Sequence, residues 1–227
     1  MIFKDRMEAA DRLAEALSPY RGQSPLILAI PRGAVPMADR IAKELDGELD
    51  VVLVRKLGAP GQPELAVGAV DESGEVYLHP YAQALHIPAT YLEEEKLEQL
   101  HTLRQRRRLY TPERPPLDPK DRVVIVVDDG IATGSTMIAA LKAIKEKGPK
   151  KLIAAVSVAP ADSAKGLGKT ADEVLCLATP EPFYAVGQFF EDFSQVDDKE
   201  VIALLNPDLS SRGGEADVVT SGKQLVL

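Results

Sequence analysis

The amino-acid sequence predicts an α/β fold, in which a mostly parallel sheet is flanked by helices. Five short apolar runs lack the polar alternation of a strand with one solvated face, so each is typical of a strand buried on both faces. Stretches with apolar residues at helical spacing lie between several of these runs, where a parallel sheet needs its crossover connections. The two patterns together indicate strands that alternate with helices around one core.

The apolar patterns place these elements in chain order. Helices are expected within residues 3–17, 35–45 and 136–147. Ser18–Pro19 ends the first helix and Gly148–Pro149 ends the last, because both pairs interrupt helical geometry. Strands are expected at residues 26–30, 51–54, 123–127, 152–158 and 174–177.

The segment between residues 58 and 122 interrupts the alternation. Residues 66–70 and 75–78 are expected to pair as a hairpin with its turn at 71–74. A long charged helix is expected over 89–110, before a stiff proline-rich connector. We interpret 58–120 as an insertion at one edge of the core, which itself comprises about 24–57 and 121–178. Residues 207–227 are expected to form a polar tail.

Composition and charge exclude several classes of protein. The 27 basic and 35 acidic residues give a net charge of −8, which argues against binding nucleic acid or anionic lipid through bulk charge. No apolar run approaches the ~20 residues that span a bilayer, and the N-terminus lacks the apolar core of a signal peptide. The single cysteine, Cys176, excludes an internal disulfide and a cysteine-rich zinc site. We therefore expect a soluble, cytoplasmic protein.

The strongest functional signal follows the third apolar run. Asp128 and Asp129 end that run, and a loop with glycines and hydroxyl side chains leads directly into a helix. Ligands of parallel sheets bind at the carboxyl ends of the strands, where loop amides and a helix N-terminus attract an anion. The loop lacks the lysine of a Walker A motif, so it suits one terminal phosphate better than a triphosphate chain. Its residues are Gly130, Ile131, Ala132, Thr133, Gly134, Ser135 and Thr136.

Two acids beside a phosphate loop need a separate explanation, because carboxylates repel phosphate. A sugar between the two sites resolves the conflict. Asp128 and Asp129 would accept hydrogen bonds from ribose hydroxyls while the loop holds the 5′-phosphate. The alternative is a capped strand-to-helix turn whose acids are simply solvated.

The acid pair and its loop resemble the phosphoribosyl pyrophosphate motif of the type I phosphoribosyltransferases. The strand before Pro31, Arg32 and Gly33 matches the family's first core strand, which leads into a pyrophosphate loop. The run before Arg55–Lys56 matches a strand that ends in basic residues near pyrophosphate. The resemblance extends from about Leu26 to Leu177. A group of uncharacterised bacterial members is also similar at residues 55–61 and 191–195.

The resemblance implies a Rossmann-like fold in a single domain at 1–206, with the insertion and a small C-terminal hood at about 179–206. It implies a reaction in which a nitrogenous base or related nucleophile displaces pyrophosphate from C1 of the ribose. The transition state is positive at the sugar, so carboxylates beneath the ribose and cations around pyrophosphate stabilise it. The resemblance therefore implies catalytic roles for Asp128, Asp129 and Lys56. Pyrophosphate would be held by Pro31, Arg32, Gly33, Arg55 and Lys56.

Further expectations follow from the same resemblance. Mg²⁺ is expected, held mainly by substrate oxygens, with Asp128 and Asp129 as the candidates for direct contact. The glycine- and proline-rich stretch at 58–63 is a candidate lid. The hood offers weak candidates for base binding, which are Phe189, Phe190 and Asp192. A homodimer is also expected.

The sequence does not identify the acceptor base. Enzymes for 6-oxopurines carry an acid where this chain has Ala132, and a lysine where it has Val158–Pro160, which argues against hypoxanthine and guanine. A second reading is a regulator that keeps the fold as a phosphoribosyl pyrophosphate or nucleotide sensor without catalysis. The basic run at 104–108 does not favour nucleic acid, because acids precede it on the same predicted helix and a solvated helix face explains both.

Overall fold

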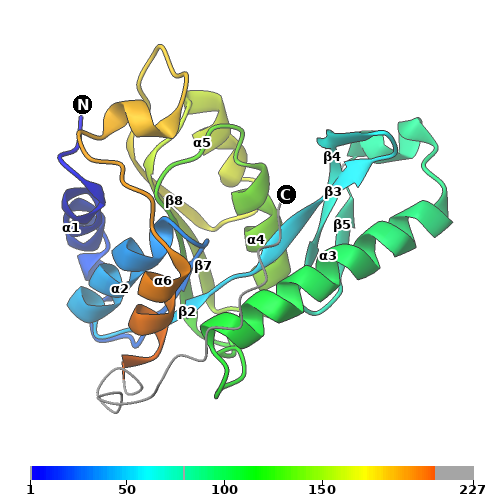
Figure 1. The fold of residues 1–227 in the computed structure, drawn as a ribbon. Helices are drawn as coiled ribbons and strands as arrows, with labels where there is room; N and C mark the ends of the chain where they lie inside the picture. The colour runs from blue at the N-terminus through cyan, green and yellow to red at the C-terminus, as the bar shows by residue number, and fades with distance from the viewer. Residues whose placement is uncertain (1, 79, 208–227) are drawn as a thin grey trace.

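The computed structural model describes residues 2–78 and 80–207, and it contains two sheets (Figure 1). The larger sheet has five parallel strands in the order β2-β1-β6-β7-β8. The parallel α/β core predicted from the sequence is therefore confirmed. Its strands are β1 (Leu26–Ala29), β2 (Glu48–Val51), β6 (Val123–Asp128), β7 (Lys151–Val158) and β8 (Glu173–Ala178).

Helices cover both faces of this sheet. One face packs against α1 (Arg6–Ala16) and α2 (Ala34–Leu45), with α6 (Asp198–Leu205) packed on α2, and the other against α4 (Ser135–Lys145) and α5 (Ala161–Leu167). Alternate residues of one strand enter different cores: Ile125 and Val127 face the first group of helices, whereas Val124 and Val126 face the second. Burial on both faces explains why these strands appear in the sequence as unbroken apolar runs.

The second apolar run, expected as one strand at 51–54, divides between the two sheets. β2 ends at Val51, and β3 (Val54–Ala59) begins an antiparallel sheet with β4 (Gln62–Asp71) and β5 (Val76–Leu78). The Val52 amide makes the last bond of this run to β1, at 3.0 Å from the Ala29 carbonyl oxygen. The expectation of a single strand was wrong, because a run of apolar residues does not show where the chain changes its pairing partner.

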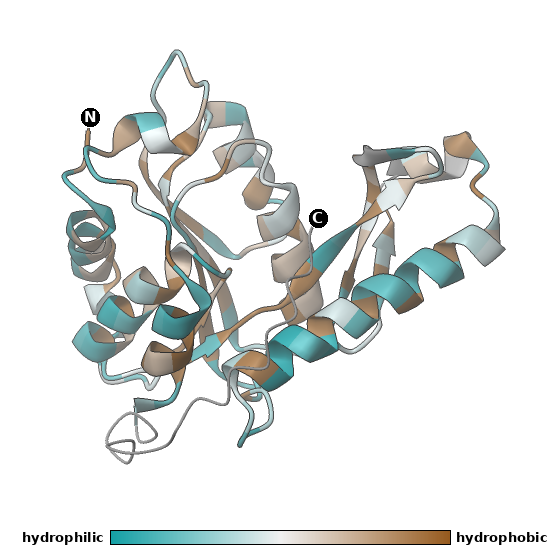
Figure 2. Cartoon of the chain, in the orientation of Figure 1, coloured by the Kyte–Doolittle hydropathy of each residue, from teal (hydrophilic) through white to brown (hydrophobic). Residues whose placement is uncertain are grey.

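Residues 54–110, called the arm here, extend from the β2 edge of the core (Figure 1). The arm carries the small sheet, the short helix η2 (Pro80–Leu85) and the long helix α3 (Ala89–Tyr110). The predicted hairpin and the predicted bounds of the long helix are both confirmed. Figure 2 shows that much of α3 is hydrophilic, as a helix with a largely solvated surface requires.

Arg107 is the exception within the basic run of α3, because its side chain is largely buried. Its guanidinium donates to Asp50 Oδ1 at 2.8 Å, to the Val51 carbonyl at 2.9 Å and to both carboxylate oxygens of Glu72 at 2.8 Å. Asp50 is 1% exposed and also accepts from the Leu117 amide at 2.9 Å. These bonds tie the arm to the point where the chain leaves the core sheet.

Arg107→Gln is expected to lower the free energy of unfolding by about 3 kcal/mol, because it leaves the partly buried Glu72 carboxylate without its cation and the buried Asp50 carboxylate with Arg114 alone, at 3.1 Å. Urea unfolding measures the loss. Arg108→Gln is the matched control, since Arg108 is the exposed neighbour on the same helix and its replacement should change stability by less than ~0.5 kcal/mol. Equal losses in the two variants would contradict this account.

The N-terminus and the predicted hood lie beside each other. Phe3 forms a parallel bridge with Phe190, in which its amide donates to the Phe189 carbonyl at 2.8 Å. The hood contains the short helix η3 (Val186–Phe189) as well as α6. In the part of the chain that the structure describes, no helix combines the length and apolar character needed to cross a membrane. The predicted tail beyond Pro207 lies outside the described residues.

Candidate active site

Two loops meet at the carboxyl edge of the five-stranded sheet. Strands β1 and β6 are neighbours, and residues 31–33 follow β1 while Asp128 and Asp129 stand at the end of β6. A Cβ atom on Gly33 would lie only 2.0 Å from Asp129 Oδ2. Glycine at this position therefore allows the first loop to press against the second acid. The Pro31–Arg32 peptide in the same loop is cis.

The loop at 130–136 is held at its start by neighbouring segments and leads into α4 through Gly134. The Ile131 amide donates to the Val158 carbonyl at 3.0 Å, and the backbone at Gly130 lies so close to Val186 of the hood that a Cβ would come within 2.4 Å. Gly134 adopts a left-handed conformation, with φ of 73°, immediately before α4. Ala132 and Thr133 are exposed between these fixed points. The structure thus presents the loop surface and the start of α4 to solvent together.

The two acids are largely buried next to each other. The Asp129 amide donates to Asp128 Oδ1 at 2.9 Å, and Asp129 Oδ2 accepts from Arg6 Nε at 2.8 Å. Burial, and then the neighbouring charge of Asp129, raise the pKa of Asp128 well above its usual value. Burial also raises the pKa of Asp129, but Arg6 opposes this effect. The pair therefore combines one carboxylate that is held by a cation with one that binds a proton more readily.

Asp128→Asn is expected to raise the melting temperature at pH 7 by a few degrees and to change it little near pH 4. A group whose pKa is higher in the folded state contributes stability at low pH and loses that contribution as the pH rises through the folded pKa. As the pH rises, the cost of ionising the buried Asp128 therefore weakens the fold, and the amide removes that cost. Thermal unfolding followed by circular dichroism at several pH values measures the effect. A variant that melts lower at pH 7 would contradict the assignment.

The basic residues predicted to hold pyrophosphate lie in different surroundings. Arg32 is partly exposed and is 3.6 Å from Asp198 on α6. Arg55 and Lys56 are consecutive on β3, so their side chains point to opposite faces of the small sheet. Arg55 donates to Gln99 on α3, and burial lowers its pKa. Lys56 shares a small cavity with Ser135 at the start of α4, so the structure brings Lys56 near the loop at 130–136 and turns Arg55 towards α3.

A model of the family described as "Phosphoribosyl transferase domain" matches residues 2–193, which is most of the chain and includes both loops of the site. The chain belongs to the phosphoribosyltransferase family. With the parallel core described above, it has the type I phosphoribosyltransferase fold that the sequence predicts.

Individual relatives agree with this assignment. A Mycobacterium tuberculosis protein named "Putative phosphoribosyl transferase" is 40% identical over 206 residues, which is 90% of this chain and 46% of that protein. A uracil phosphoribosyltransferase of Lachnoclostridium phytofermentans is 29% identical over 169 residues, or 74% of this chain and 72% of that protein. The crystal structure of TT1426 from Thermus thermophilus has a TM-score of 0.81 and 47% identity, covering 90% of this chain and 98% of that one. The chain spans about half the length of the mycobacterial relative.

The hood buries two of the residues predicted to contact a base. The Phe189 and Phe190 side chains are each 6% exposed. The Phe190 ring lies 5.4 Å from the Phe3 ring, and the Phe189 ring 5.0 Å from that of Phe183. Base stacking on either ring would require it to leave the core. Tyr184, which is 83% exposed, is the large apolar side chain that the hood presents to solvent in the described structure.

Two other sequence predictions have a defined place in the structure. Asp192 is exposed, and its carboxylate accepts from the amide and the hydroxyl of Ser194. The candidate lid at 58–63 forms the turn of the β3–β4 hairpin, where Gly61 has a φ of 70°. The Tyr91 hydroxyl on α3 donates to the Gly58 carbonyl at 3.2 Å, so this turn is anchored to α3.

Sequence reasoning missed Arg6, which contacts Asp129 from a position 123 residues away. Arg6 is the first residue of α1, and Asp5 caps that helix by accepting from the Met7 and Glu8 amides at 2.9 Å. The capping aspartate predicts where the helix begins. No local pattern indicates that the next side chain reaches the carboxyl end of β6.

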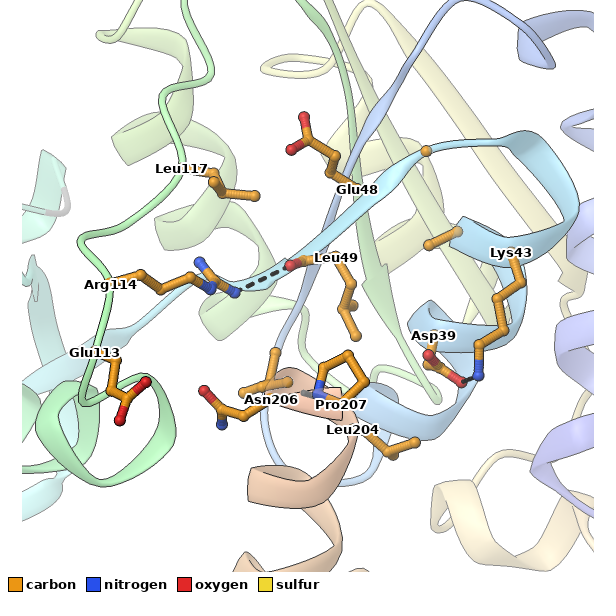
Figure 3. Close-up of a pocket in the computed structure, with 13 residues that line it drawn as sticks. Asp39, Lys43, Glu48, Leu49, Glu113, Arg114, Leu117, Leu204, Asn206 and Pro207 are labelled. Atoms are coloured by element: carbon orange, nitrogen blue, oxygen red, sulfur yellow. Dashed lines mark hydrogen bonds and ion pairs between the residues drawn. The ribbon is translucent and has the colours of Figure 1, made fainter. Parts of the chain in front are cut away.

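A cavity of about 550 Å³ lies at the opposite edge of the sheet (Figure 3). It is lined by the start of β2, the connector after α3 and the end of α6, and Arg114 donates there to the Leu49 carbonyl at 3.2 Å. None of the predicted site residues lines this cavity. It is therefore separate from the site formed by the two loops.

Proposed function

We propose that this chain transfers the 5-phosphoribosyl group of phosphoribosyl pyrophosphate to a nitrogenous base or related nucleophile, with release of pyrophosphate. The observation that carries the proposal is the contact between Gly33 and Asp129, which joins the glycine loop after β1 to the acid pair after β6. One ligand that has a sugar between two phosphate groups matches two anion loops with carboxylates between them. Family membership supports the same reaction.

The chemistry assigned to each residue follows from where charge develops. The bond from C1 to the pyrophosphate oxygen breaks as the bond from C1 to the nucleophile's nitrogen forms, so C1 gains positive charge and pyrophosphate gains negative charge. Asp128 and Asp129 stabilise the sugar, and the loop at 130–136 holds its 5′-phosphate through amides and hydroxyls. Arg32 and the backbone at 31–33 are assigned to pyrophosphate. Lys56 lies near Ser135, so its charge would attract the 5′-phosphate in addition to its catalytic role.

The proposal includes Mg²⁺, for which the site supplies two carboxylate side chains. The described part of the chain contains no group of three or more His, Cys, Asp or Glu side chains that could hold a metal ion. Asp128 and Asp129 offer the carboxylate oxygens that Mg²⁺ prefers, while most of its ligands would be substrate oxygens and water. When bound, the ion would neutralise part of the pyrophosphate charge.

The acceptor is proposed only as a nitrogenous nucleophile. Ala132 and Val158–Pro160 still argue against 6-oxopurines, and the name of the Lachnoclostridium relative makes uracil a reasonable member of any panel. Homodimer formation stays a prediction from the family resemblance, and cytoplasmic location stays a prediction from the composition of the sequence.

An assay of pyrophosphate release tests the proposed function. The chain is incubated with phosphoribosyl pyrophosphate, Mg²⁺ and single bases, including uracil, adenine, orotate and hypoxanthine. Release that depends on one of the bases is the expected result. Tight binding of phosphoribosyl pyrophosphate without turnover on any base would instead support a ligand sensor, and it would contradict the proposed reaction.

A further inference from the structure

The Arg6 side chain contacts a carboxylate, a backbone carbonyl and an aromatic ring at the same time. Its Nε donates to Asp129 Oδ2 at 2.8 Å, and its Nη1 donates to the Ser194 carbonyl at 2.7 Å. Its guanidinium also lies 3.8 Å from the centre of the Phe193 ring, a stacking distance for a cation on an aromatic face. One largely buried cation thus contacts the second acid and the hood segment 193–194 at the same time.

The N-terminal segment fixes the position of Arg6 relative to the hood. The Glu191 amide donates to the Phe3 carbonyl at 2.8 Å, and the Asp192 amide donates to the Lys4 carbonyl at 2.9 Å. Residues 3–4 and 189–192 are therefore joined by backbone bonds directly before α1 begins. Because Arg6 opens that helix, a displacement of the hood would move its guanidinium away from Asp129.

Asp129 needs such a partner more than an exposed acid would. Its carboxylate is largely buried, and this burial raises the pKa of Asp129 and so disfavours its ionised form. The Arg6 guanidinium favours the ionised form of Asp129, and its bond through Nε at 2.8 Å fixes which carboxylate oxygen faces α1. The orientation of the other oxygen, which a sugar hydroxyl would meet, is then fixed as well.

We propose that Arg6 is a positioning residue that orients the Asp129 carboxylate and links it to the hood segment 189–196, so that sugar binding and hood order are coupled. The sugar in this statement rests on the proposed function, whereas the link between Arg6, Asp129 and the hood does not. Arg6 acts through Asp129 and need not touch the substrate.

A double-mutant cycle on ligand affinity tests the first half of this inference. Titration calorimetry with phosphoribosyl pyrophosphate and Mg²⁺ is carried out on the wild type, Arg6→Gln, Asp129→Asn and the double variant. Arg6→Gln is expected to weaken binding about tenfold in the wild-type background and by less than about twofold when residue 129 is Asn. Arg6→Lys keeps the charge and should recover part of the affinity. Equal losses in both backgrounds, or no loss, would overturn the inference.

Hydrogen exchange of the segment 189–196 tests the second half. Phosphoribosyl pyrophosphate is expected to slow its exchange in the wild type and in Arg40→Gln, a control that removes an exposed ion pair between α2 and α1, but not in Arg6→Gln. Failure of the wild type to bind the ligand would refute the proposed function separately. In that case the ligand-free proteins decide: Arg6→Gln must speed exchange in this segment, and unchanged exchange would refute the link.

Discussion

Replacing both Asp128 and Asp129 with Asn is expected to slow pyrophosphate release by about a thousandfold, because removing one preorganised electrostatic group costs about 10²–10³ and adjacent groups that act as a unit are not additive. The positive charge at C1 exists in the transition state and not in the bound sugar phosphate. The two carboxylates should therefore affect turnover much more than they affect binding of ribose 5-phosphate. The phosphate loop at 130–136 is unchanged in this variant.

Steady-state pyrophosphate release and calorimetry with ribose 5-phosphate measure the two effects separately. The affinity for ribose 5-phosphate should stay within about tenfold, since the loop amides and hydroxyls still bind the phosphate. Glu94→Gln, on the exposed surface of α3, is the control for loss of a negative charge. Turnover that survives the double replacement would show that the two acids have no catalytic role.

Gly33→Ala is expected to weaken binding of phosphoribosyl pyrophosphate by about tenfold to a hundredfold, because forcing an extra methyl group into a filled contact costs roughly 1–3 kcal/mol. The new Cβ would lie 2.0 Å from Asp129 Oδ2 and 2.9 Å from its Cγ, so the carboxylate or the loop must move. Arg6 holds that carboxylate at 2.8 Å, which makes a simple rotation costly. The change should therefore disturb the pyrophosphate loop and the sugar acid together.

Gly166→Ala is the matched control for this prediction. Gly166 lies in α5, and a Cβ atom there meets nothing within 4 Å, so the same substitution should leave binding unchanged. Calorimetry with phosphoribosyl pyrophosphate and Mg²⁺ compares the two variants. Equal affinities in Gly33→Ala and the wild type would show that the approach of the two loops has no role in binding.

Patterns that act within one element predicted much of this structure. The bounds of α3 follow from the charged helical stretch, and the parallel strands follow from runs that are apolar on both faces. The acid pair and its loop were placed at the carboxyl edge because β6 and α4 adjoin them directly. Each of these inferences needed only residues close together in the chain.

Contacts between distant residues explain what the sequence did not predict. The change of sheet between β2 and β3 depends on pairing with β4, which the run at 51–54 does not encode. The burial of Phe189 and Phe190 depends on the N-terminal Phe3 and on the rings that surround them. Arg55 and Lys56 look equivalent in sequence, but the alternation of a strand sends one side chain to α3 and the other towards α4.

A crystal structure of the chain with phosphoribosyl pyrophosphate and Mg²⁺ tests the central claim most directly. The account predicts the 5′-phosphate on the amides of 130–136, the ribose hydroxyls within hydrogen-bond reach of Asp128 and Asp129, and the pyrophosphate on residues 31–33. A ligand found instead in the cavity beside Leu49 and Arg114, or bound without contact to either acid, would contradict it.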